Sequence, residues 1–153
     1  MKRADFSPGT GTSVRPKVFI KTNETTWFDP ENCAFCKTLT EDPSTLKNMK
    51  GELHDISNGL AMITTVKPES LASYRKAREE MDKLGQEIMD GKTGVQVCNH
   101  CESYGNLVMT GAKFDNMKTE TGEVTIISSE KPELLDSIRE FGRRTREAMA
   151  SWK

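Results

Sequence analysis

The chain has 153 residues, the length of one ordinary domain that can bury a core without disulfides. Hydrophobic residues make up 35% of it and charged residues 29%, so we expect a soluble protein with a well-hydrated surface. The formal net charge of −1 creates no field that would attract nucleic acid or anionic lipid. No stretch is long and apolar enough to span a membrane, so neither nucleic acid nor a membrane is expected as a partner.

Residues 1–30 are expected to form an N-terminal arm. Residues 1 to about 16 are rich in Ser, Pro, Gly and Thr, whereas 17–22 are β-prone and could add an edge strand. Because no apolar run follows Lys2 and Arg3, the start of the chain does not read as a secretory leader, and we expect a cytoplasmic protein. The remaining residues, 31–153, are expected to form a single domain.

The first half of this domain begins with a cysteine pair, Cys33 and Cys36, on an expected short helix capped by Asp29 or Asn32. Two strand-like runs flank Asn58-Gly59, which predicts a hairpin with a type I′ turn. A long helix is then predicted from Pro68 to near Gly91. Its apolar residues recur at spacings of three and four: Leu71, Tyr74, Ala77, Met81, Leu84 and Ile88.

The second half shows the same order of elements. A short extended segment, 94–98, leads into the pair Cys98 and Cys101, and a helix is predicted from Glu102 to about Ala112. A hairpin over 114–128 has its turn at Glu120-Thr121-Gly122. The last helix begins at Pro132, and its predicted inward stripe is Leu135, Ile138, Phe141, Thr145, Met149 and Trp152.

Three landmarks recur at offsets of about 63 to 65 residues: the cysteine pair, the turn glycine and a Lys-Pro-Glu tripeptide at 67–69 and 131–133. This pattern predicts an internal duplication, with repeat one at 31–92 and repeat two at 93–153. Each αββα unit would leave an apolar face uncovered, so the two should pack together. The predicted fold is α+β, an antiparallel sheet of about four strands with helices on one face. Such a one-sided sheet is compatible with a homodimer.

The chain contains only four cysteines, Cys33, Cys36, Cys98 and Cys101. Cys-x-x-Cys spacing directs two sulfurs at one atom, and two such pairs complete the tetrahedral thiolate shell that suits zinc or, as an alternative, iron. Residues 37–97 separate the pairs, far more than the roughly 15–20 residues of a zinc ribbon. A duplicated fold could still bring them together. A shell of four thiolates leaves no open position, so we expect a structural metal and no catalysis.

An alternative function is thiol–disulfide exchange by Cys98 and Cys101. The stretch Cys98-Asn99-His100-Cys101, preceded by Val95-Gln96-Val97, resembles the active-site segment of the thioredoxin-like oxidoreductases. The resemblance implies redox catalysis with a cis-proline facing the cysteines. The downstream proline, Pro132, is instead expected to begin a helix. In a thiol–disulfide oxidoreductase of this kind, the first cysteine pair would have no role.

A further alternative is an interaction module without metal, whose ligand or partner the sequence does not identify. Two histidines add to the candidates. His54, on a predicted strand, could be a fifth ligand or hydrogen-bond to a thiolate, although a surface strand histidine is the simpler interpretation. His100, inside the second pair, could ligate the metal or point away from it.

Overall fold

The structure is a computed structural model and describes residues 17–151. The first 16 residues of the predicted arm, and Trp152 of the predicted stripe, lie outside this range. Within it, no helix has the length and apolar character needed to cross a membrane.

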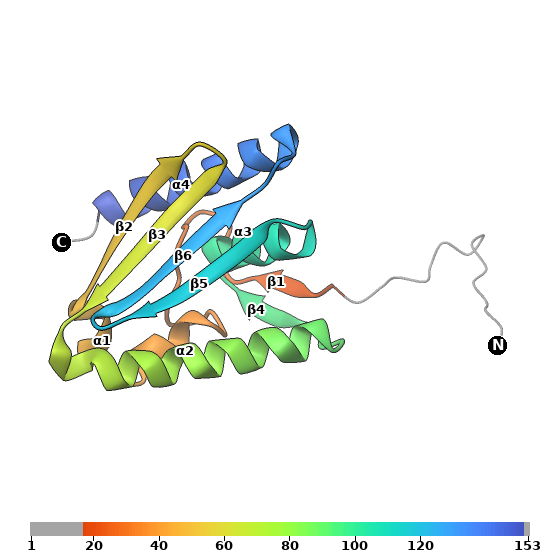
Figure 1. The fold of residues 1–153 in the computed structure, drawn as a ribbon. Coiled ribbons are helices and arrows are strands. Elements are labelled where there is room, and N and C mark those ends of the chain that lie inside the picture. The colour runs from red at the N-terminus through yellow and green to blue at the C-terminus, as the bar shows by residue number, and fades with distance from the viewer. Residues whose placement is uncertain (1–16, 152–153) are drawn as a thin grey trace, which may run out of the picture.

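A four-stranded antiparallel sheet forms the centre of the fold (Figure 1). Its strands are β2 (Met49–Ile56), β3 (Gly59–Val66), β5 (Lys113–Thr119) and β6 (Gly122–Ser128). They lie in the order β2-β3-β6-β5, so each hairpin contributes one inner and one edge strand. The predicted α+β class and the antiparallel sheet of four strands are therefore confirmed.

The first hairpin turns differently from the prediction. Its two-residue turn is Ser57-Asn58, and Gly59 already pairs with Ile56 as the first residue of β3. A type I′ turn needs positive φ at both central residues, and no described residue other than glycine has one, so the predicted turn type is wrong. Gly59 is required for another reason: a Cβ there would lie 1.8 Å from the carbonyl oxygen of Ile127 on β6.

Two long helices pack on one face of the sheet. α2 (Pro68–Met89) and α4 (Pro132–Ala150) each begin with a proline at the first helical turn after a lysine N-cap. Figure 1 shows α4 behind the strands and α2 along their lower side. The buried residues of α4 are Leu134, Ile138, Phe141, Gly142 and Thr145, so Leu134 rather than the predicted Leu135 occupies the core.

The main hydrophobic core lies between α4 and the sheet. Leu53, Leu60 and Ile127 of the strands pack there against Ile138 and Phe141 of the helix. Trp27, which precedes the first cysteine pair, belongs to the same cluster and donates a hydrogen bond from Nε1 to Oγ1 of Thr145, 3.1 Å away. The segment before the first cysteine pair is thus fastened to the last helix.

The first cysteine pair does not lie on an α-helix as predicted. Cys33 is in a turn, and Cys36 begins a 3-10 helix, η2 (Cys36–Thr40), which is followed by the short α1 (Ser44–Lys47). The hydroxyls of Thr38 and Thr40 donate to the carbonyls three residues earlier, which favours the tighter 3-10 turn over a continuous helix.

A second, two-stranded sheet lies beside the cysteines. β1 (Phe19–Lys21) pairs in parallel with β4 (Val95–Val97). β4 runs directly into the second cysteine pair and α3 (Asn99–Met109). This small sheet therefore joins a segment before the first cysteine pair to the segment that carries the second.

Candidate metal centre

The first cysteine pair is held against β4 by its own backbone. The N–H of Ala34, between the two cysteines, donates to the carbonyl of Gln96 on β4 over 2.7 Å. The N–H of Cys33 donates to the carbonyl of Asp29, which closes the preceding turn. The pair is thus placed next to the strand that leads into Cys98.

The second pair lies at the start of α3, where Cys98 is the N-cap residue. The side-chain amide of Asn99 donates to the carbonyls of Asn23 and Thr26, at 3.0 and 2.6 Å. The N–H of His100 donates to the carbonyl of Trp27. These three bonds fasten the loop between β1 and the first cysteine pair to the beginning of α3.

The result is a cluster of four sulfur atoms. All four Sγ atoms, of Cys33, Cys36, Cys98 and Cys101, lie within 4.8 Å of one another. The Sγ of Cys36 is 3.9 Å from that of Cys98 and 3.5 Å from that of Cys101, and all four residues are free thiols. A tetrahedral ion with zinc–sulfur bonds of about 2.3 Å would separate its sulfurs by about 3.8 Å. The cluster therefore has the size of a four-thiolate metal site.

The cluster is shielded from solvent. Cys33 and Cys98 are at most 1% exposed, Cys36 is 8% exposed, and only Cys101 is half-buried. The residues packed around the sulfurs are apolar. They come from β1, β4, the residue before η2 and the end of α2: Phe19, Phe35, Leu84, Ile88, Val95 and Val97. Water has little access to most of the cluster.

The close approach of the four thiols shifts their pKa values in opposite directions. Hydrogen bonds from Cys101, and then from Cys36 and Cys98, hold the pKa of Cys33 far below its usual value. The same contacts act oppositely on Cys101, whose pKa is raised by Cys33 first and then by the other two thiols and by burial. The thiols of Cys36 and Cys101, whose pKa values are raised, thus stabilise the thiolate of Cys33 by hydrogen bonding, and a divalent cation would replace these contacts by accepting all four sulfurs.

The two histidines lie in different surroundings, and neither belongs to the four-sulfur group. His100 stacks on Phe28 at a centroid distance of 4.7 Å and lies 5.1 Å from the ring of Phe141. Burial lowers the pKa of His100 to about 4, so its ring is neutral near pH 7. Its Nδ1 is 3.7 Å from the Sγ of Cys101. His54 is on β2 with its side chain 58% exposed, next to Glu52.

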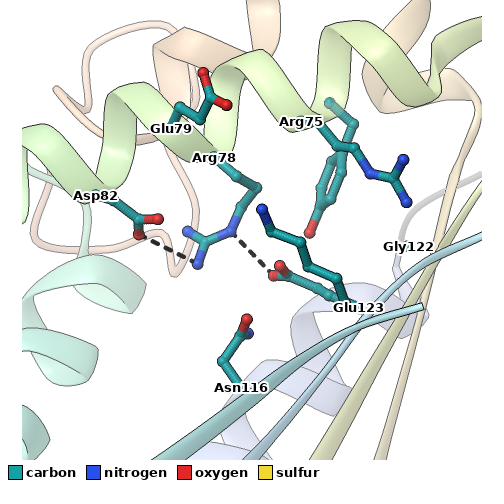
Figure 2. Close-up of a pocket in the computed structure, with 9 residues that line it drawn as sticks. Arg75, Arg78, Glu79, Asp82, Asn116, Gly122 and Glu123 are labelled. Atoms are coloured by element: carbon teal, nitrogen blue, oxygen red, sulfur yellow. Dashed lines mark ion pairs between the residues drawn. The ribbon is translucent and has the colours of Figure 1, made fainter. Parts of the chain in front are cut away.

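A polar cluster beneath α2 was missed from the sequence. Figure 2 shows Arg78 of α2 directed at Glu123 of β6, with Nε of the arginine 3.0 Å from Oε2 of the carboxylate. The contact is an ion pair without good hydrogen-bond alignment at Nε. Asp82 also pairs with Arg78, at 3.5 Å. The charged residues that line this small pocket are equal in number: Arg75, Arg78 and Lys118 against Glu79, Asp82 and Glu123.

Burial is the largest single influence on Arg78 and disfavours its charge, but Glu123, Tyr74, Asp82 and Tyr104 together outweigh it and hold the pKa of the guanidinium above its ordinary value. Tyr74, one helical turn earlier, is 4% exposed. Its pKa is raised by burial and then by Glu123. Sequence periodicity places position 78 next to the buried stripe of α2, and a charged residue at such a position is the signal from which a buried partner could have been predicted.

The chain was compared with protein family models, with curated proteins and with solved structures, and none of them matches. The functional interpretation therefore depends on the geometry of the sulfur cluster.

Proposed function

We propose that Cys33, Cys36, Cys98 and Cys101 bind one metal ion, zinc in preference to iron, as a structural centre. The observation that carries the proposal is the gathering of four free thiols within 4.8 Å in a mostly buried, apolar setting. Thiols in such a setting gain little from one another, whereas tetrahedral thiolate coordination is the preferred environment of zinc and ferrous iron.

A structural role follows from the donor set. Four thiolates occupy every position of a tetrahedral ion, so no site remains for a substrate or a reactive water. Burial of Cys33 and Cys98, and the apolar residues around them, also exclude solvent from the ion. The protein is therefore not proposed as an enzyme. The thiols must remain reduced to bind metal, which fits the cytoplasm.

Thiol–disulfide exchange at Cys98 and Cys101 is the second candidate, because Cys98 is the N-cap of α3 and its pKa is lowered, first by the thiol of Cys101. Two features disfavour it. The first cysteine pair lies against this site, with Cys36 only 3.5 Å from Cys101. Pro132, the downstream proline, begins α4, and no described peptide bond is cis, whereas the resemblance to the thioredoxin-like enzymes implies a cis-proline opposite the cysteines.

We also infer that the two halves of the chain arose by duplication, and that the metal joins them. The support is reciprocal pairing across the middle of the sheet. Gly59 pairs with Ser128 while Gly122 pairs with Thr65. A Cβ on Gly59 would lie 1.8 Å from the carbonyl oxygen of Ile127, and one on Gly122 would lie 1.9 Å from that of Thr64. Both helices that follow begin at Lys-Pro-Glu.

The test is metal analysis of protein purified without added metal, combined with a count of free thiols. We expect about one zinc per chain in the wild type and loss of the metal in Cys33→Ser, because an incomplete shell binds far more weakly. A metal-free wild type with one reducible disulfide in each pair would overturn the proposal and favour redox chemistry.

The matched control is Val97→Ala. Val97 is as deeply buried as Cys33 and precedes Cys98, but it carries no ligand atom. We expect this variant to lose stability by about 1 to 3 kcal/mol through the cavity that it creates and to keep its metal. If Val97→Ala lost the metal as completely as Cys33→Ser, general unfolding rather than ligand removal would explain both results.

A further inference from the structure

Within residues 17–151, one face of the four-stranded sheet carries no helix. The residues that contact α2 and α4 alternate along each strand: Leu53 of β2, Leu60 of β3, and Glu123 and Ile127 of β6. Their strand neighbours therefore point to the opposite side. In Figure 1 this is the side of β2 and β3 away from α4.

The middle of this uncovered face is apolar. The pairing of the strands places Ala61 beside Ile126, and Ile63 beside Val124 and, one strand further, Met117. The first four of these residues are half-buried, and Met117 is 57% exposed. We call these five residues the open-face patch. A contiguous apolar patch of this kind marks an interaction surface.

Charged residues of both signs border the patch on the two edge strands. β2 contributes Lys50, Glu52 and His54, and β5 contributes Lys113 and Asp115. The two lysines balance the two carboxylates at neutral pH. The border has no excess of either sign, so it is not suited to a strongly acidic or basic partner.

The order of these charges fits a second copy of the same face. In one arrangement the twofold axis of the dimer runs parallel to the strands through the middle of the patch. β2 then packs on the partner's β5, and His54 lies opposite the partner's Asp115. In the other arrangement the axis runs perpendicular to the strands, in the plane between the two sheets. β2 then packs on the partner's β2, and His54 lies opposite the partner's Glu52. Neither arrangement opposes like charges, and both bring the apolar patches together.

We propose that the protein forms a homodimer by packing the open faces of two sheets against each other. The strands have seven or eight residues. With a rise of about 3.4 Å per residue and a spacing of about 4.8 Å between strands, they give a face of roughly 500 Å², so the dimer would bury about 1,000 Å² in total. That area is at the lower limit for a specific interface, and the expected dimer therefore dissociates at micromolar concentration.

The experiment is sedimentation equilibrium of the purified full chain over a concentration series from low micromolar upward. We expect the mass to rise from one chain of 17.2 kDa toward twice that value. Met117→Lys should raise the dissociation constant at least tenfold, because a lysine would be desolvated in the interface. Met89→Lys is the matched control, because Met89 is a similarly exposed methionine, 65% against 57%, on α2, and the dissociation constant of this variant should equal that of the wild type.

Ile63→Glu gives a second, stronger disruption, with the circular dichroism spectrum and metal content checked to show that the variant is folded. A wild type that stays monomeric throughout the series would overturn the proposal. So would a dimer that Met117→Lys and Ile63→Glu leave as tight as the wild type, because association would then occur through a strand edge or a helix.

Discussion

The two hairpin and helix units of the molecule, residues 49–89 and 113–150, have the same order of elements but are stabilised differently. Their inner strands pair reciprocally through Gly59 and Gly122. Their helices differ. α4 covers an apolar core with Leu134, Ile138 and Phe141, whereas the buried residues of α2 are Ser70, Tyr74 and Ala77, and Arg78 lies on its sheet side.

The difference indicates where the proposed metal contributes. The last turns of α2 place Leu84 and Ile88 against the cysteine cluster rather than against the four-stranded sheet. Apart from the cysteines, the buried members of that cluster are two valines, Val95 and Val97, and its larger apolar residues are only partly buried, so it would be a weak core without an ion. We therefore expect hydrophobic packing to stabilise the α4 side of the molecule, and metal binding to stabilise the cysteine side.

The largest expected effect is that of metal removal. A chelator should lower the free energy of unfolding by at least about 4 kcal/mol, since a tightly bound ion stabilises only the folded state. Hydrogen exchange should show the loss locally, in β1, β4 and the start of α3 first. If the amides of β3 and β6 lost protection to the same extent at the same chelator concentration, the two sides would not differ as described.

The counterpart on the α4 side is Ile138→Ala. Ile138 is fully buried in the main core, so the variant should lose about 2 to 5 kcal/mol in urea unfolding. It should retain its metal, because none of the four cysteines that form the sulfur cluster lies on α4. Loss of the metal in this variant would show that the two sides of the molecule unfold together.

The hairpins are expected to be equivalent. Gly59→Ala and Gly122→Ala should each destabilise by about 2 kcal/mol or more and by similar amounts, because each new Cβ would meet a carbonyl oxygen of the opposite inner strand. Gly85→Ala is the control, since nothing lies within 4 Å of its Cβ position in α2, and it should gain up to about 1 kcal/mol. Clearly unequal losses at Gly59 and Gly122 would argue against the inferred symmetry.

A smaller effect is expected beneath α2. Glu123→Gln removes the negative charge opposite Arg78, and we expect a loss of about 1 kcal/mol because the guanidinium is only partly buried. Urea unfolding should show that replacing both residues, Arg78→Met with Glu123→Leu, recovers most of this loss. A double variant as unstable as the sum of the single changes would mean that the two residues are not coupled.

The smallest effect concerns pH. Burial, and then Glu123, raise the pKa of Tyr74 in the folded protein above the unfolded value of about 10. The neutral phenol therefore contributes its full stability below pH 10, and this contribution is lost as the pH rises further. Tyr74→Phe should show a shallower decline in unfolding free energy above pH 10 than the wild type. Identical slopes would contradict the assignment.

Much of the fold follows from periodicity in the sequence. Apolar spacing predicted α2 and α4, and the glycines marked both hairpins, because these signals are local. The parallel pairing of β1 with β4 could not be predicted, since each strand has only three residues and the partners are far apart in the chain. The turn type was wrong because Gly59 serves a contact with β6 rather than a positive φ.

The four cysteines converge, as their paired spacing predicted, but the sequence did not reveal what causes this convergence. It depends on backbone hydrogen bonds such as that from Ala34 to Gln96, and on Asn99 holding the loop before the first pair. Backbone groups carry no sequence signal of their own. The pair of Arg78 and Glu123 was missed for a related reason: the position of Arg78 beside the buried stripe of α2 indicates a buried partner but does not identify Glu123.

The most direct test of the central claim is titration of the reduced, metal-free protein with cobalt(II), followed by absorption spectroscopy. We predict saturation at one cobalt per chain, with the intense ligand-field bands of a tetrahedral ion and sulfur-to-cobalt charge transfer from four thiolates. Zinc should displace the cobalt, because a thiolate site of this geometry favours it. A weak octahedral spectrum, or saturation at two ions per chain with each cysteine pair binding separately, would contradict the account.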